Sequence, residues 1–500
     1  MPSHESEIII VGAGVFGLSA ALWLARDGYQ KITVYDRTDY DATNYDPANG
    51  CSAASADINK IFRTAYGDQQ EYQDLAIEAR DMWMAWNEQI AGAKEAELPK
   101  PLTPHDKLLE ECGVYYLSSG EGKLTSHFQQ SLDTLAETAP SIRQRIYLKG
   151  DQEEEKRLAT EMDAKWKAKY HIADKLAGGS SHGFLDTSGG VTYAYKACMY
   201  AKHLCSQSGV QFVLGDSQGR LKRLAKDRNT GKVIGITTCD DKLHLATLVI
   251  LACGSWTASV LPEAHRTVEA TTGSVMYIDV PADRRDIRQK FSPENFPVWH
   301  YRRGQQGDDG YYEGGGFPIT SDGRLKFGFR GRKLTNFQDH PFQTALRVSM
   351  PWTDGADKFL KTVPKYNLDL QKQVIAEVFP ELAEFGFTDS RLCWYTDSPD
   401  NSFVIDYVPG YGDSLFICTG GSGHGFKFLP ILGRYVKNQI EHNHDQFTQM
   451  WKWRSAVAGE PCNHLNEGES RDIKAIQMAS AKDYRFDSVC ERLGVVEAEV

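Results

Sequence analysis

Three glycines near the start of the chain, Gly12, Gly14 and Gly17, have the spacing G-x-G-x-x-G. They follow an apolar, β-forming run and precede a helical pattern, a context in which they allow a tight turn, close approach of a pyrophosphate and close packing of helix on strand. Asp36 lies 19 residues after Gly17, close to the ~20 expected for a carboxylate that holds ribose hydroxyls. The motif predicts a dinucleotide site, and an ordinary glycine turn in a βα unit is the alternative. The predicted contacts are Gly12, Gly14, Val15, Phe16, Gly17 and Asp36.

A second strand, glycine loop and helix start occur towards the end of the chain. Residues 415–419 are apolar and β-forming, residues 420–427 form a glycine-rich loop, and a helix is expected over 428–442. The N–H groups at such a helix start suit an anion or an electron-rich ring. In a flavoenzyme the loop can lie against the pyrimidine end of the flavin and stabilise negative charge on the reduced ring. A turn that holds no ligand is the alternative.

The composition, 41% hydrophobic and 25% charged over 500 residues, is that of a globular protein with two or three domains. A net charge of −11 disfavours nucleic acid as a partner, and no apolar run approaches the ~20 residues that span a bilayer. The ten cysteines include no C-x-x-C pair, so neither a metal site nor a disulfide framework is predicted. Without a secretory signal or a C-terminal S-K-L, a cytoplasmic location is expected.

The strands and helices that must position these residues are predicted from the pattern of apolar residues along the chain. Residues 211–214 are expected to form a strand that can return to the first sheet, and residues 245–251 a further strand. From 268 to 329 the pattern is alternating and aromatic, which is typical of an antiparallel sheet with one covered face. Helices are expected over 342–348 and 368–379.

Six short segments form a jointly specific series. They are Gly12 to Gly17, Asn59 to Gly67, Ala252 to Trp256, Leu325 to Gly328, Arg391 to Asp397 and Gly421 to Lys427. In this order they resemble the monomeric sarcosine oxidase family, and most closely its fungal branch of fructosyl-amino-acid oxidases (amadoriases), saccharopine oxidases and pipecolate oxidases. The resemblance runs from about residue 7 to residue 442. It implies a monomeric enzyme with FAD, not NAD, as its cofactor.

The resemblance also implies a fold. A discontinuous, Rossmann-like α/β domain of the glutathione-reductase type would bind FAD, and an inserted α+β substrate domain would be built on an antiparallel or mixed sheet. The expected FAD-binding segments are 1–105, 181–263 and 398–445. The expected substrate-domain segments are 106–180 and 264–397, and residues 446–500 would form a tail with one helix.

Several site residues can be carried over from the family. Cys393 matches the cysteine that bonds covalently to the flavin 8α-methyl group, and a buried, unreactive cysteine is the alternative. Lys427 matches the lysine that grips the substrate carboxylate, with Arg63 as a second cation near it. An ordinary ion pair is the alternative for Arg63. Lys60 should lie near the flavin face. The further implied cofactor contacts are Val213, Gly254, Gly423, Gly425 and Phe426.

Lys326 matches the lysine that activates oxygen, since a buried cation stabilises the negative charge that develops as superoxide forms. Tyr312 and Tyr395 match aromatic residues that line the substrate cavity, and core packing is the alternative for each. Arg330 departs from the family pattern, because amadoriases have a glutamate there that contacts sugar hydroxyls and sarcosine oxidase has a histidine. This cation favours a substrate with an acidic or hydrogen-bond-accepting group.

These residues predict an FAD-dependent oxidase of secondary amines, either N-methyl or N-alkyl amino acids or imino acids. The amine and O2 would give an imine and hydrogen peroxide. Hydrolysis of the imine is one outcome, and ring closure by an internal nucleophile, as in alkaloid pathways of fungal secondary metabolism, is another. The alternatives are a fructosyl-amino-acid oxidase, an NAD-dependent dehydrogenase that uses only the first motif, and a flavin-binding protein without oxidase activity.

Overall fold

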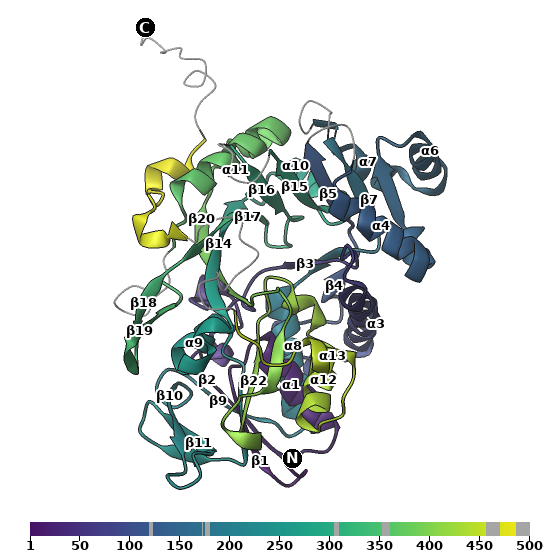
Figure 1. Ribbon diagram of the computed structural model, residues 1–500. Helices are drawn as coiled ribbons and strands as arrows, with labels where there is room; N and C mark the ends of the chain where they lie inside the picture. Colours follow the sequence, from purple (N-terminus) through teal and green to yellow (C-terminus); the bar gives the residue numbers. More distant parts are fainter. Residues whose placement is uncertain are drawn as a thin grey trace.

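Two main β-sheets lie one above the other in the computed structural model, as Figure 1 shows. The structure describes residues 1–119, 124–172, 174–175, 181–304, 310–352, 361–456 and 471–486. The lower sheet is largely parallel and the upper one largely antiparallel. This arrangement confirms the predicted fold class, a Rossmann-like α/β part combined with a second, sheet-based part.

The lower sheet has the strand order β21-β22-β13-β1-β2-β9, with β21 antiparallel at its edge. Its central strands are buried on both faces, which explains why they are continuous apolar runs in the sequence. The predicted return of residues 211–214 to this sheet is confirmed, since they pair in parallel with β2. The strands are β1 (Glu7–Val11), β2 (Lys31–Asp36), β9 (Gln211–Leu214), β13 (Leu248–Leu251), β21 (Val404–Tyr407) and β22 (Leu415–Thr419).

Helices α1 (Val15–Arg26), α8 (Ala194–Gln207) and α12 (Leu432–Ile440) pack together against the lower sheet. The approach of α1 and α12 is very close, because a Cβ at Gly433 would lie 1.8 Å from the carbonyl oxygen of Ser19. The long helix α3 (Gln70–Gly92) adds buried tryptophans to the same core. A small antiparallel sheet contacts β13, and its strands are β10 (Leu221–Lys226), β11 (Val233–Thr238) and β12 (Leu243–Leu245).

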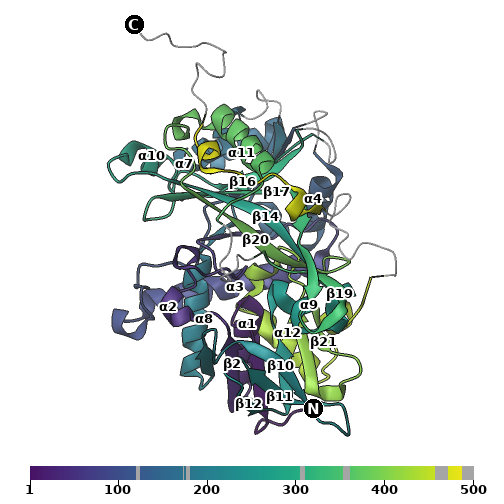
Figure 2. The ribbon, with the colours of Figure 1, turned by 90° about the vertical axis from the view of Figure 1, so that its left-hand side faces the viewer.

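The upper sheet has the order β20-β14-β17-β16-β15-β5-β7-β6, and β23 pairs with β17. Its two long strands β14 and β20 pair in register from Glu269↔Asp397 to Tyr277↔Asp389 and run towards the lower layer (Figure 2). The strands are β5 (Val114–Ser119), β6 (Ile146–Lys149), β7 (Ser181–Asp186), β14 (Glu269–Asp279), β15 (Val298–Arg303), β16 (Tyr312–Gly316), β17 (Arg324–Thr335), β20 (Asp389–Asp397) and β23 (Arg471–Asp472).

The remaining elements connect or cover these sheets. The helices are α2 (Tyr40–Thr43), α4 (Ser126–Thr138), α5 (Pro140–Arg143), α6 (Gln152–Glu161), α7 (Ala164–His171), α9 (Thr257–Val260), α10 (Arg285–Lys290), α11 (Lys365–Val378) and α13 (Gln446–Met450). The additional strands are β3 (Lys60–Phe62), β4 (Leu109–Glu110), β8 (Gly190–Thr192), β18 (Phe337–His340) and β19 (Gln343–Ser349).

Three sequence-based expectations differ from the structure. The helix expected over 342–348 is absent, because Gln343–Ser349 form strand β19, which pairs with β18 in a hairpin. Residues 181–186 form β7 of the upper sheet, although they were expected within an FAD-binding segment. The helix expected over 428–442 begins later, since Gly425–Phe428 form a 3₁₀ turn and α12 starts at Leu432.

The segment expected to be a tail is partly integrated into the fold. It contains the short helix α13, and Arg471–Asp472 pair with the end of β17. Ile473 is buried in the core formed by the upper sheet and α11. The rest of the tail prediction falls on residues 457–470 and 487–500, which lie outside the described residues.

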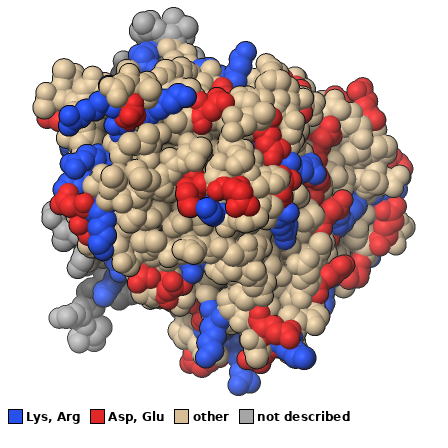
Figure 3. All heavy atoms as spheres, turned by 90° about the horizontal axis from the view of Figure 1, so that it is seen from below, with Lys and Arg blue, Asp and Glu red and all other residues tan. Residues whose placement is uncertain are grey.

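Acidic and basic side chains lie next to one another on the face seen from below in Figure 3. Among the described residues, no helix combines the length and apolar character needed to cross a membrane.

Candidate active site

A cavity of about 870 Å³ connects the two glycine loops and is closed on one side by strands of the upper sheet. Most of the residues predicted from the sequence line it. They are Gly12, Gly14, Val15, Phe16, Asp36, Lys60, Arg63, Gly254, Lys326, Arg330, Cys393, Tyr395, Gly423, Gly425, Phe426 and Lys427. Residues that are far apart in the sequence are therefore brought together around one elongated site.

Three predicted site residues lie outside the lining. A Cβ at Gly17 would lie 1.8 Å from the carbonyl oxygen of Gly12, so Gly17 serves the packing of helix on turn. Val213 pairs with Tyr35 within the lower sheet. Tyr312 is fully buried in the upper core and its hydroxyl donates to Gln371 at 3.0 Å. Tyr312 therefore packs in the core, which was the alternative considered for it.

The first glycine loop has the shape that a dinucleotide needs. Gly12 has φ +111°, a conformation that glycine alone adopts readily. The Asp36 carboxylate accepts from the Ala13 N–H at 2.8 Å, which fixes it beside the turn. The Ser55 hydroxyl accepts from the Val15 N–H at 2.9 Å and would lie 3.0 Å from a Cβ at Gly14. The bare backbone of the loop, the start of α1 and the fixed carboxylate together fit the pyrophosphate and ribose of such a ligand.

A buried cluster of charges surrounds Asp57, which is fully buried. Its carboxylate is 2.7 Å from Lys326 Nζ, 2.8 Å from Lys60 Nζ and 3.2 Å from Arg391 Nη2. Lys326 also donates to the carbonyl oxygen of Asn59 at 2.7 Å. One carboxylate thus holds three cations, of which Lys60 and Lys326 line the cavity. The cluster is net positive when all four groups are charged.

Burial would raise the pKa of the Asp57 carboxyl, but the three cations hold this pKa well below its usual range. Burial lowers the pKa of Lys326 to about 8, although the attraction of Asp57 opposes this shift. The Lys326 ammonium is therefore poised to lose its proton just above neutral pH, which is unusual for a lysine.

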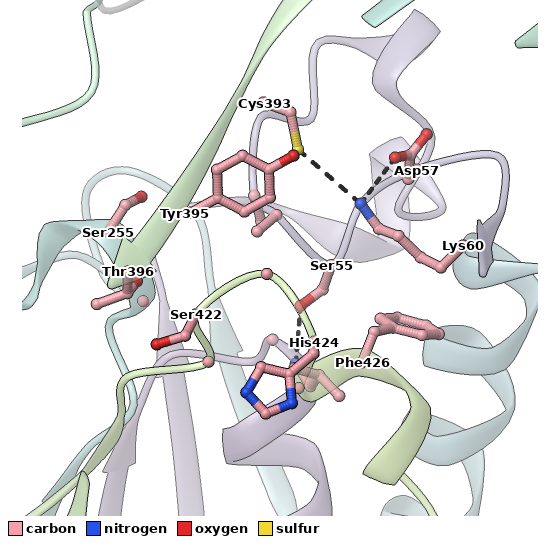
Figure 4. A pocket seen from close by; sticks show the side chains of 18 of the residues that line it. Ser55, Asp57, Lys60, Ser255, Cys393, Tyr395, Thr396, Ser422, His424 and Phe426 are labelled. Atoms are coloured by element: carbon pink, nitrogen blue, oxygen red, sulfur yellow. Dashed lines mark hydrogen bonds and ion pairs between the residues drawn. The ribbon is translucent and has the colours of Figure 1, made fainter. Parts of the chain in front are cut away.

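Cys393 lies at the wall of the same cavity and is 3% exposed. Its sulfur is 3.9 Å from Lys60 Nζ, and Figure 4 shows this ammonium between the sulfur and Asp57. The cation is close enough to stabilise the negative charge that a sulfur nucleophile must carry. Tyr395, two residues further along β20, points into the cavity from the same face of the strand.

Lys427 is held by neutral groups. Its Nζ donates to the Tyr66 hydroxyl at 2.6 Å and lies 3.4 Å from the carbonyl oxygen of His424. His424 Nε2 donates to the carbonyl oxygen of Asn401 at 2.9 Å, so Nδ1 accepts from the Tyr66 hydroxyl at 3.2 Å. Tyr66 can therefore accept from Lys427 and donate to a neutral His424 at the same time.

Two arginines surround this lysine. The Arg63 guanidinium lies 4.1 Å from the centre of the Tyr66 ring, and its Nη1 donates to the carbonyl oxygen of Ala65. Burial lowers the pKa of Lys427 well below its usual range, and the charges of Arg63 and Arg330 lower this pKa further. Among the described residues, neither Lys427 nor Arg63 has a carboxylate partner. This corner is therefore prepared to receive an anion.

Sequence reasoning missed four residues of the site, which are Asp57, Tyr66, Arg391 and His424. The last three lie within segments that carry the family resemblance, so the resemblance pointed to them without giving them a role. Asp57 lies two residues before such a segment. Its importance arises from partners on strands 269 or more residues away, a relationship that no local pattern reveals.

Replacing Asp57 by Asn should leave three buried cations without their counter-charge. We expect the free energy of unfolding to fall by about 3–5 kcal/mol, as for other buried ion pairs that lose one partner. Because the pKa of Asp57 is depressed in the fold, this stabilisation is present at neutral pH and is lost as the pH falls below the ordinary aspartate pKa. Chemical denaturation of the holoenzyme measures the effect.

Asp241→Asn is the matched control, because Asp241 pairs with Lys222 at an exposed site. In this control, the free energy of unfolding should fall by less than about 1 kcal/mol. Equal losses for the two variants would contradict a special structural role of Asp57.

Comparisons with known proteins identify the family. Residues 7–439 match the family model described as DAO, FAD dependent oxidoreductase. The L-saccharopine oxidase of Schizosaccharomyces pombe is 26% identical to this chain, covering 89% of it and 93% of that protein. An amino acid oxidase of Aspergillus fumigatus is 25% identical over 88% of this chain and 93% of its own length. The N-methyl-L-tryptophan oxidase of Salmonella newport is 25% identical, with coverages of 85% and 92%.

Solved structures support the fold. The fructosyl peptide oxidase of E. terrenum has a TM-score of 0.75 and 22% identity, covering 95% of this chain and 98% of that chain. Because the family model spans most of the chain, and because the cavity joins both glycine loops, this protein belongs to the FAD dependent oxidoreductase family and takes FAD as its cofactor.

Proposed function

We propose that this enzyme oxidises secondary amines, namely N-methyl or N-alkyl amino acids or imino acids, with O2 as the acceptor. The observation that carries the proposal is the buried Lys427 ammonium, which has Arg63 beside it and neutral hydrogen-bond acceptors in place of a carboxylate partner. Such a corner binds a carboxylate, and it shares a cavity with the cationic cluster around Asp57. The names of relatives that act on saccharopine and N-methyl-L-tryptophan point to the same substrate class.

The substrate carboxylate would bind to Lys427 and Arg63. Binding an anion would raise the pKa of Lys427 again, so the lysine is charged in the complex. A carboxylate fixed at this point orients the adjacent Cα–H and amine groups within the cavity. Aromatic side chains line another part of the cavity and leave a site for a bulky substituent. They are Tyr116, Phe128, Phe184 and Trp299.

In the proposed reaction, the Cα–H and N–H bonds of the amine break and a C=N bond forms, which releases two electrons and two protons. FAD, when bound, would supply the two-electron redox chemistry that links the amine to O2, and O2 with these two electrons and two protons becomes hydrogen peroxide. Lys326 would stabilise the negative charge that develops on oxygen, because its buried ammonium faces the cavity next to Lys60. Cys393 would hold FAD covalently through its 8α-methyl group, with Lys60 beside the sulfur.

Replacing Cys393 by Ala should break the covalent link. After acid precipitation, we expect FAD in the supernatant of this variant and flavin attached to the precipitated unaltered protein. Cys253→Ala is the control, because Cys253 lines the same cavity. Flavin that stays with the Cys393→Ala polypeptide would place the link elsewhere.

Replacing Lys326 by Met should slow reoxidation by O2 on the order of 10²–10³-fold, the usual effect of removing one stabilising group from a developing anion. Anaerobic reduction by the amine should change little. Stopped-flow absorbance separates the two half-reactions, and equal effects on both would assign Lys326 to another step.

The pH dependence provides a second test of Lys326. Its pKa of about 8 means that the charge is present below this pH and lost above it, so reoxidation of the unaltered enzyme should slow as the pH rises through about 8. The reoxidation rate of Lys326→Met should show no such fall. The reoxidation rate of Lys326→Arg should not fall above pH 8. A fall that persists in Lys326→Met would belong to a different group.

Replacing Lys427 by Ala should raise the KM of carboxylated amines roughly 10- to 100-fold, the effect of losing a hydrogen bond to a charged group. Steady-state peroxide assays over a panel of N-methyl amino acids, imino acids and fructosyl amino acids measure it. Lys474→Ala, at an exposed lysine, is the control. An unchanged KM for Lys427→Ala would remove this residue as the carboxylate anchor.

A further inference from the structure

We infer that the tip of the β18–β19 hairpin closes the cofactor site over the adenine ring of FAD, with the phenyl ring of Phe342 stacked on the adenine. Pro341 and Phe342 form the two-residue connection between the two strands. Both residues line the same cavity as Asp36. The hairpin lies beside α9 in both views of the ribbon (Figures 1 and 2).

Phe342 differs from the exposed apolar side chains of the small sheet, which are Ile234, Leu243 and Leu245. Its exposed fraction is 61%, close to the 63% of Leu245. Phe342 belongs to the cavity lining, whereas the other three residues lie outside it. A single apolar side chain on a protein surface is ordinary. An exposed phenyl ring at the wall of a cofactor cavity is positioned to stack on a flat ligand.

The base of the hairpin is fixed to the rest of the protein. The Ser349 hydroxyl donates to the carbonyl oxygen of Ala270 at 2.6 Å and accepts from the Asn336 N–H at 2.9 Å. Asn336 Nδ2 donates to the carbonyl oxygen of Met350 at 3.0 Å, and Met350 packs on Ala258 of α9. The tip is therefore presented to the cavity by an ordered base, which limits the entropy that a bound ligand must remove.

Packed side chains connect the hairpin to the ribose end of the dinucleotide site. Trp256 packs against the same apolar cluster as Met350, and the Arg37 guanidinium lies 5.1 Å from the centre of the Trp256 ring. Arg37 directly follows Asp36, the carboxylate expected to hold the ribose. All four residues line the cavity. Because the adenine is bonded to this ribose, it lies in the part of the cavity that Arg37, Trp256 and the hairpin tip border.

The segment that leads into β10 forms another wall of this part of the cavity. A Cβ at Gly219 would lie 2.2 Å from the carbonyl oxygen of Asp36, so this segment packs directly on the end of β2. Leu221, at the start of β10, also lines the cavity. The end of the cavity is thus bordered by β2, β10 and the hairpin tip. Phe342 supplies an aromatic ring there, and a purine stacks on such a ring whatever its hydrogen-bonding edge meets.

FAD binding to the Cys393→Ala holoenzyme tests the inference without turnover, because this variant lacks the sulfur proposed to hold FAD covalently. Dilution releases FAD, and the recovery of flavin fluorescence gives its dissociation constant. In this background, we expect Phe342→Ala to raise the FAD dissociation constant about 10- to 100-fold, the effect of losing one stack between a base and an aromatic ring. Phe342→Trp, which keeps a flat ring, should retain most of the affinity.

Leu245→Ala is the matched control, because Leu245 is similarly exposed and lies outside the described lining. It should leave the FAD dissociation constant unchanged. FMN, which has the flavin but no adenine, should bind equally well with and without Phe342→Ala. An FAD dissociation constant that Phe342→Ala leaves unchanged would overturn the inference. A loss of FMN affinity as large as the loss of FAD affinity would also overturn it, since the effect would then not concern the adenine.

If flavin stays attached to the Cys393→Ala polypeptide, the Tm of the holoenzyme takes the place of the dissociation constant. Phe342→Ala should lower this Tm, because a contact with a bound group stabilises the folded state, and Leu245→Ala should not. An unchanged Tm for Phe342→Ala would contradict the stack. A change of oligomeric state without a loss of FAD binding would assign the ring to a contact between copies of the chain and overturn the inference. Neither measurement depends on the amine substrate.

Discussion

Much of the site depends on the buried carboxylate of Asp57. The residue lies three positions before the start of β3, and its partners include Lys326 on β17 and Arg391 on β20. These ion pairs therefore join the segment that follows the first nucleotide-binding unit to two strands of the upper sheet. Buried ion pairs add little net stability compared with apolar packing, but they require a restrictive geometry. The carboxylate thus links the two layers, and two of its cations, Lys60 and Lys326, line the cavity between them.

The two strands tied to Asp57 also carry the side chains that would meet the flavin and the substrate. Alternation along β17 aims Lys326 and Arg330 into the cavity, and alternation along β20 does the same for Cys393 and Tyr395. A shift of either strand by one residue would turn its functional side chains towards the opposite face. The ion pairs of Asp57, formed by residues of both strands, help to hold the register on which the site depends.

Local sequence patterns predicted the parts of this protein whose structure is determined locally. The first glycine motif, with its strand, helix and Asp36, forms the expected unit, because each of these features depends on neighbouring residues. Tyr312 could not be placed in this way, since a strand pattern does not say which face meets the core. Residues 343–349 form a strand because of their pairing with β18, which overrides a weak local preference. Asp57 was missed because its partners are distant in the sequence.

The two lysines of the site show opposite ways of placing a buried cation. Lys326 is bound to a carboxylate that it shares with Lys60 and Arg391, so its charge is compensated in part and its position is fixed by the ion pair. Lys427 is bound to a hydroxyl and a carbonyl, which fix its position and leave its charge uncompensated. An internal carboxylate next to Lys427 would compete with that of the substrate, whereas Tyr66 and a neutral His424 do not. The cost of burying this charge is reflected in the lowered pKa of Lys427, and a bound anion would relieve it. Under the proposed function, a neutral ligand would leave this charge uncompensated, so an acidic substrate would bind in preference to a neutral one.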